Sequence, residues 1–124
     1  MSTPGAPTAA ELRAATDALC DDLATAAATT LGVVRLEPTL RNVLRRLQAG
    51  STVLLNGRGA RSAADGIELY RRVDVVDVRV DVVTGPTRSA AETARDVRRA
   101  LVEVLARHDL RPGTIAVAVL NVER

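Results

Sequence analysis

The stretch VDVRVDVV at residues 76–83 has the most regular pattern in the chain. Valine occupies every second position from 76 to 82, and Asp77, Arg79 and Asp81 lie between the valines. Successive side chains of a strand point to opposite faces, so the pattern predicts a strand with one buried face and one mostly solvated face. Upstream, the apolar positions 67, 69, 73 and 75 have the opposite phase. This shift predicts a tight turn near residues 71–75 that joins two antiparallel strands.

Two long helical patterns flank this pair of strands. TAAE at residues 8–11 and SAAE at residues 89–92 are capping boxes, in which a hydroxyl and a carboxylate bind backbone amides at the start of a helix. Apolar or small residues follow each box at spacings of three or four, as far as Thr30 and His108. The spacing predicts two long helices, each with one apolar face.

The remaining segments give shorter elements. Residues 33–36 predict a short strand, and Pro38 starts a second helix that Gly50 ends. Residues 52–55 are a candidate strand, and the Gly-, Ala- and Arg-rich residues 57–66 after an Asn-Gly turn predict a flexible loop. Residues 114–122 carry no charge, which predicts a central or buried strand.

We therefore predict an α+β two-layer sandwich, in which two long helices cover a small mixed or antiparallel sheet, with the order α-β-α-β-β-α-β. A length of 124 residues suits one domain, residues 8–124, after a disordered tail at residues 1–7. We expect no secretory signal, and the longest uncharged runs are shorter than the roughly 20 residues of a spanning helix. We expect a cytoplasmic protein with no membrane span of its own.

The composition excludes several classes of protein. All 17 basic residues are arginine, and the chain holds one Cys and one His. Without Lys, a Walker-A loop and a Schiff-base enzyme are excluded, and a single Cys and His exclude a zinc finger. Without Phe and Trp, the stacking platforms of RRM and OB-type domains are excluded. Cys20 lies in a helical pattern and is expected to be a buried apolar residue. We expect no cofactor and no metal.

Two candidate ligand sites have simpler interpretations. Asp74, Asp77 and Asp81 could bind a metal ion, but Arg79 lies between the last two, and charge pairing on one strand face explains the pattern. NGRG at residues 56–59 could hold a phosphate, but it lacks the third glycine of a dinucleotide fingerprint, and a turn is favoured.

His108 and Asp109 raise a catalytic hypothesis, with Ser62 or Ser89 as the nucleophile. The helix macrodipole stabilises a His in the last turn of a helix without any catalysis. A small-molecule enzyme that uses His108 is therefore only an alternative hypothesis, and we expect no catalytic residue.

Two groups of arginines form the candidate interaction surface: Arg41, Arg45 and Arg46 on the second predicted helix, and Arg98 and Arg99 on the last one. A solvated, salt-bridged helix face is the simpler interpretation, above all for the second group, because acidic residues lie among its arginines. The net charge is only +2, so we do not expect nucleic acid as a partner. An Arg-rich nucleic-acid-binding module that uses the first group is the alternative.

The pattern of residues 12–122 resembles the alkaline-shock-protein family of bacterial envelope-stress proteins. The resemblance rests on the alanine-rich helix that runs into Gly32, the alternating strand before Gly85, the following helix and the closing strand IAVAVLNV at residues 115–122. It implies a non-enzymatic cytoplasmic protein of cell-envelope homeostasis. It also implies a self-associating scaffold or adaptor with a small integral-membrane protein as its partner.

Overall fold

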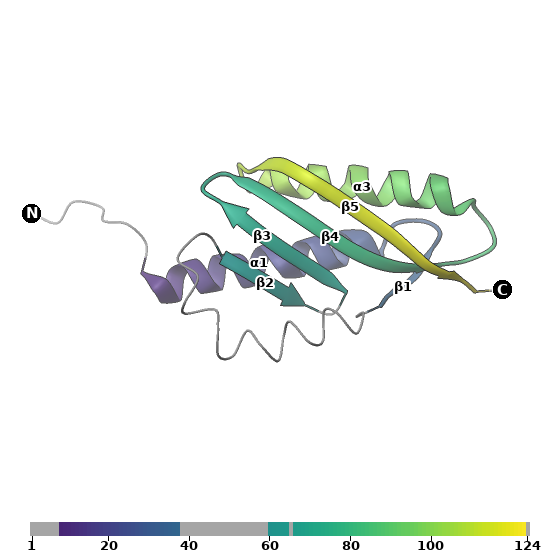
Figure 1. The fold of residues 1–124 in the computed structure, drawn as a ribbon, viewed down its shortest axis with the longest axis horizontal. Helices are drawn as coiled ribbons and strands as arrows, with labels where there is room; N and C mark the ends of the chain where they lie inside the picture. Colours follow the sequence, from purple (N-terminus) through teal and green to yellow (C-terminus); the bar gives the residue numbers. More distant parts are fainter. Residues whose placement is uncertain (1–7, 38–59, 65, 124) are drawn as a thin grey trace, which may run out of the picture.

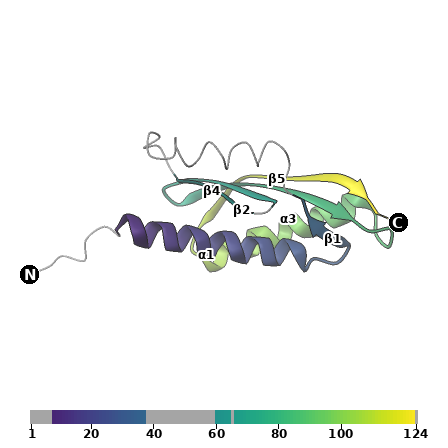
Figure 2. The same cartoon turned by 90° about the horizontal axis from the view of Figure 1, so that it is seen from below.

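The computed structural model describes residues 8–37, 60–64 and 66–123. The elements in chain order are α1 (Ala9–Ala28), β1 (Val33–Leu36), β2 (Ala60–Ala64), β3 (Ile67–Arg72), β4 (Val75–Thr84), α3 (Ala90–Arg107) and β5 (Arg111–Val122). The strands form one sheet, and both helices lie on the same face of it (Figures 1 and 2). The predicted α+β two-layer fold is confirmed. The predicted tail at residues 1–7, the helix after Pro38, the strand at 52–55 and the turn at 56–57 lie outside the described residues.

Strand β4 is the centre of the sheet. β5 pairs with it in parallel along its full length. β3 pairs antiparallel with the first part, Val75 to Val80, and β1 pairs antiparallel with the last part, Val82 to Thr84. Because β5 occupies one side of β4 throughout, β3 and β1 share the other side. At their junction the backbone N–H of Asp81 donates to the carbonyl of Gly66 at 3.2 Å.

The tight turn predicted between the alternating strands is confirmed. β3 ends at Arg72, and β4 begins at Val75, directly opposite it. Val73 has a φ of 52° within this turn, which is unusual for a β-branched residue. The shift in hydrophobic phase therefore marks the turn, and the valines of β4 point toward the helices.

The prediction of a flexible loop over residues 57–66 is wrong for Ala60–Ala64, which forms β2 and pairs antiparallel with β3. The segment reads ARSAA, with no β-branched or aromatic residue, so no local signal predicts the strand. Its pairing with β3, the next strand along the chain, overrides the weak strand preference of its own residues. β2 forms the edge of the described sheet opposite β5.

The expectation that the last strand is central or buried is also wrong. β5 begins earlier than predicted, at Arg111, and among the described strands it pairs only with β4. Val117 and Val119 pack against the core, whereas Ala116 and Leu120 are exposed. The uncharged sequence therefore belongs to an edge strand whose second face is open.

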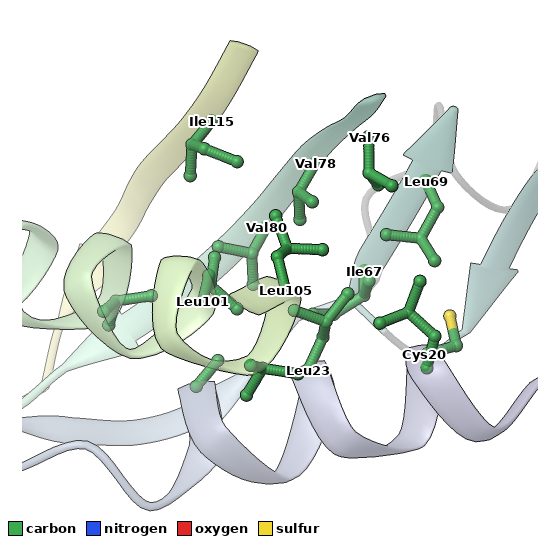
Figure 3. Close-up of a cluster of buried hydrophobic side chains, with 14 of the residues drawn as sticks. Cys20, Leu23, Ile67, Leu69, Val76, Val78, Val80, Leu101, Leu105 and Ile115 are labelled. Carbon is green, nitrogen blue, oxygen red and sulfur yellow. The ribbon is translucent and has the colours of Figure 1, made fainter. Parts of the chain in front are cut away.

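The core lies between the sheet and the two helices (Figure 3). Leu23 of α1 and Leu101 and Leu105 of α3 meet the alternating valines of β4 there. All of these side chains are buried, including the valines Val76, Val78, Val80 and Val82. Cys20 is buried beside them, as predicted, with 2% of its surface exposed. This packing holds α1 beneath β1, β2 and β3, and α3 beneath β5.

Candidate interaction surface

Strand β5 has an outer edge that no other described strand covers. It is twelve residues long, and its last nine residues are uncharged. An edge strand exposes unpaired backbone N–H and C=O groups, and natural proteins usually protect a long edge with charges, prolines or a covering element. β5 has a proline only at its second position, Pro112. The uncharged part of β5 before Val122, residues 114–120, is therefore suited to pairing with another chain.

Exposed apolar side chains gather at one end of the sheet, where β4 and β5 end and β1 begins. Four of the six large hydrophobic residues that are exposed among the described residues lie here: Leu31, Val34, Leu120 and Val122. Val122 lies opposite Thr84, and Val34 contacts the position where Gly85 would carry a side chain. We call these four residues the apolar end. Clustering of this kind marks protein interaction sites.

The arginines Arg98 and Arg99 are both exposed on α3. The guanidinium of Arg99 lies 3.9 Å from the carboxylate of Asp96, so it belongs to a loose surface pair. Arg98 and the neighbouring Arg95 make no ion pair within the described part of the chain. Arg41, Arg45 and Arg46 lie outside the described residues.

Arg95 and Arg98 face the outer side of α3. The other side of the helix forms a groove with α1, which Ala100, Glu103 and Arg107 line. Arg98 and Arg107 are nine residues apart, so they lie on opposite sides of the helix, about 180° from each other. Because α3 packs beneath β5, the flank with Arg98 runs along the β5 edge.

Two aspartates lie on the outer side of α1, at the edge of the sheet opposite Arg95 and Arg98. Asp17 and Asp21 are exposed, and neither makes an ion pair within the described residues. Each lies nine residues before a residue of the α1–α3 groove, Ala26 and Thr30, and therefore faces away from α3. No local motif marks these two residues as interaction residues. A comparison of the two helical wheels would have shown the opposite charges, but only the sheet order places them at opposite edges.

His108 is a bridge between the helices. Its ring Nε2 lies 2.7 Å from Oδ2 of Asp22, next to a groove of about 480 Å³ between α1 and α3. Ser89 caps the far end of α3, about 28 Å along the helix axis from His108. The structure therefore does not bring these two residues together. Ser62 lies in β2, where it pairs with Leu69.

The three aspartates proposed as metal ligands have separate partners. Asp74 binds the guanidinium of Arg111 through two contacts of 3.0 and 3.2 Å. Asp77 accepts a hydrogen bond from the backbone N–H of Thr114 at 2.8 Å.

The fully buried Asp81 lies 3.5 Å from the guanidinium of Arg79, so the interpretation as charge pairing is confirmed for these two residues. Within residues 8–37, 60–64 and 66–123, no group of three or more His, Cys, Asp or Glu residues is placed to hold a metal ion.

None of the described helices is both long and apolar enough to cross a membrane.

Similarity to known proteins is limited to remote matches among solved structures. No family model matches the chain, and no curated protein matches it. Among solved structures, a triple variant of the MamM CTD is 11% identical, with a TM-score of 0.48 over 89% of this chain and 99% of that one. A double variant of the MamM CTD gives the same identity and score over 90% and 99%, and the copper form of a single variant gives a score of 0.47.

The resemblance to the alkaline-shock-protein family is therefore wrong. No family model matches the chain, and the solved structures named above are MamM CTDs. The quoted features are a capped alanine-rich helix, an alternating strand and a valine-rich closing strand, which any two-layer α+β domain can share. The role in envelope homeostasis was implied by that resemblance alone.

Proposed function

We propose that this domain is a non-enzymatic interaction module that associates with further copies of itself. The observation that carries the proposal is the open edge of β5, whose uncharged outer half ends in Leu120 and Val122. These side chains are 46% and 45% exposed. An edge of this length and composition promotes association with another chain.

The apolar end adds an area for a partner to cover. Leu31 is 69% exposed and lies in the turn directly before Gly32, whose carbonyl accepts a hydrogen bond from Gly85 at 2.9 Å. That turn is held against the end of β4, so the apolar side chains sit on an ordered surface. A pre-organised apolar surface loses little entropy on binding.

The oligomeric state of the purified chain tests the proposal. We expect light scattering after size-exclusion chromatography to give a mass above that of one chain, and the double variant Leu120→Lys, Val122→Lys to lower it. Val73→Lys is a matched control, because Val73 is 89% exposed in the turn at the opposite end of β4. A wild-type chain that stays monomeric up to millimolar concentration would refute self-association.

The proposal includes an adaptor role inside the cell, with a small integral-membrane protein as the partner. The exposed side chains of the apolar end support this role, because they give a membrane protein an apolar surface to bind. Cell fractionation after crosslinking tests this role. We expect the wild-type chain in the membrane fraction and the Leu120→Lys, Val122→Lys variant in the soluble fraction. Equal distribution of both proteins would exclude an adaptor role for this surface.

A further inference from the structure

We infer that copies of this chain join through two different surfaces: the outer flank of α3 in one copy, with Arg95 and Arg98, binds the outer flank of α1 in the next, with Asp17 and Asp21. The inference rests on the proposed self-association and adds its geometry. Its basis is the opposite charge of two flanks that lie at opposite edges of the same sheet.

The basic flank belongs to the β5 edge. α3 packs beneath β5, and Arg95 and Arg98 lie on the side of α3 that faces away from α1. Both are exposed, and neither is neutralised by an acid within the described residues. The acidic residues of this helix, Asp96 and Glu103 among them, lie toward the groove with α1 or toward solvent. A partner that binds at the β5 edge therefore contacts the positive charges of Arg95 and Arg98 on the face of the sheet that the helices cover.

The acidic flank belongs to the β2 edge. α1 packs beneath β2 and β3, and its side away from α3 carries Asp17 and Asp21 beside the small residues Ala24 and Ala28. The small residues allow another helix to approach closely. Arg13 is the remaining charge near this flank, and it lies on the side of Asp17 away from Asp21.

The contact requires neighbouring copies to be staggered. The bond between His108 and Asp22 places these residues at the same level of two antiparallel helices. Arg95 and Arg98 lie about eleven residues from His108, toward the start of α3. Asp17 and Asp21 lie about three residues from Asp22, toward the start of α1, which is the opposite direction because the helices are antiparallel. At 1.5 Å per residue, a shift of about 20 Å brings the two pairs together.

The same shift brings the two sheet edges together at the apolar end. Ser62 of β2 lies level with Leu69, Val78 and Ile115 in the sheet. A shift of about 20 Å corresponds to about six residues of a strand. It therefore places β2 of the next copy beside the end of β5, around Leu120. The strands β2 and β5 both run parallel to β4, so this contact would be a parallel pair.

Two independent features, the charges of the helices and the exposed end of β5, therefore give one arrangement. The two surfaces differ, so the contact is heterologous, and repeating it gives a ring or a filament rather than a closed dimer.

Charge exchange tests this arrangement. In one variant, Asp17 and Asp21 are both replaced by Arg, and in the other, Arg95 and Arg98 are both replaced by Asp. We expect each variant alone to lose the large assembly, because its two flanks repel each other. We expect an equimolar mixture to assemble, since each basic flank then meets an acidic one, and the fourfold variant to assemble by itself. Raising the salt concentration should weaken assembly of the wild-type chain.

Arg99→Asp is the matched control, because Arg99 lies on the solvent side of α3, and we expect wild-type assembly from it. If both double variants assemble like the wild type, or if their mixture does not restore assembly, the inference is overturned while self-association stands. If the wild-type chain is itself monomeric, the proposed function fails as well. Circular dichroism of each variant shows that the fold is retained.

Discussion

The ring nitrogen Nε2 of His108 lies 2.7 Å from Oδ2 of Asp22, and this contact ties the end of α3 to the middle of α1. The two residues are 86 positions apart in the chain, and their side chains are 29% and 56% exposed. A half-exposed pair of this kind stabilises a fold only modestly. Its main effect is to set the relative level of the two helices.

We expect His108→Gln and Asp22→Asn each to lower the free energy of unfolding by about 0.5–1 kcal/mol. The physical reason is the loss of a bond that links two helices and closes a long loop. Urea denaturation followed by circular dichroism measures the change, and a double-mutant cycle isolates the pair. Glu103→Gln in α3 is the control, with no expected loss, because Glu103 is exposed and lies outside the proposed contact between copies. Additive effects in the cycle would mean that the contact does not form in solution.

Much of the fold follows from short-range sequence signals. The capping box at Thr8 is present as predicted, with the backbone N–H of Glu11 donating to the Thr8 hydroxyl. The hydroxyl of Ser89 accepts the corresponding bond from Glu92. The phase shift before Val76 marks a real turn. Each of these features depends on residues within one turn of helix or one hairpin.

The interaction surface depends on longer-range relations. The sequence shows Arg98 on a mixed-charge helix face. Only the structure shows that this face lies at the edge of the sheet, because α3 packs beneath the edge strand β5. Likewise, only the sheet order shows that Asp17 and Asp21 lie at the opposite edge of the sheet, because it places α1 there. No window of neighbouring residues contains this information.

The pair of Asp74 and Arg111 gives a prediction for pH. The hydrogen bond from the Arg111 guanidinium holds the pKa of Asp74 below the ordinary carboxyl value of 3.8. Because the pKa in the folded state is lowered, the pair stabilises the fold above that value, and this stabilisation is lost as the pH falls through the folded-state pKa.

We expect Arg111→Gln to return the pKa of Asp74 to the ordinary carboxyl range and to remove this part of the acid dependence of stability. An NMR titration of the side-chain carboxyl carbons measures it directly. Arg99→Gln is the control, because Arg99 pairs loosely with Asp96 and not with Asp74, and we expect it to leave the Asp74 titration unchanged. An unchanged Asp74 titration in Arg111→Gln would contradict the assigned cause.

Gly32 is a position that other residues cannot occupy without strain. Its φ is +98°, and a Cβ atom there would lie 2.5 Å from Oγ1 of the buried Thr93. We expect Gly32→Ala to destabilise the domain by about 1–3 kcal/mol, because it combines an unfavourable backbone conformation with a steric overlap. Thermal unfolding measures the change.

Gly85→Ala is the matched control for Gly32→Ala. The nearest side chain to a Cβ at Gly85 is Val34, at an ordinary 3.5 Å, so we expect little loss. The additional change Thr93→Ser removes the methyl group at 3.2 Å but leaves both the hydroxyl oxygen at 2.5 Å and the backbone strain, so we expect it to restore little stability. Equal stability of Gly32→Ala and Gly85→Ala would show that the turn between α1 and β1 differs from the one described.

Val73 presents the opposite case, a side chain whose removal should stabilise the protein. It lies in the β3–β4 turn with a φ of 52° and is 89% exposed, so it contributes strain and almost no packing. Glycine adopts this backbone conformation without the steric cost that a β-branched residue has there. We expect Val73→Gly to raise the free energy of unfolding by about 0.5–1 kcal/mol, after allowing for the greater entropy of glycine in the unfolded chain. Urea denaturation measures the gain. Val73→Ala keeps a Cβ atom, so its gain should be smaller, and a loss of stability in Val73→Gly would show that the turn in solution does not use the left-handed conformation.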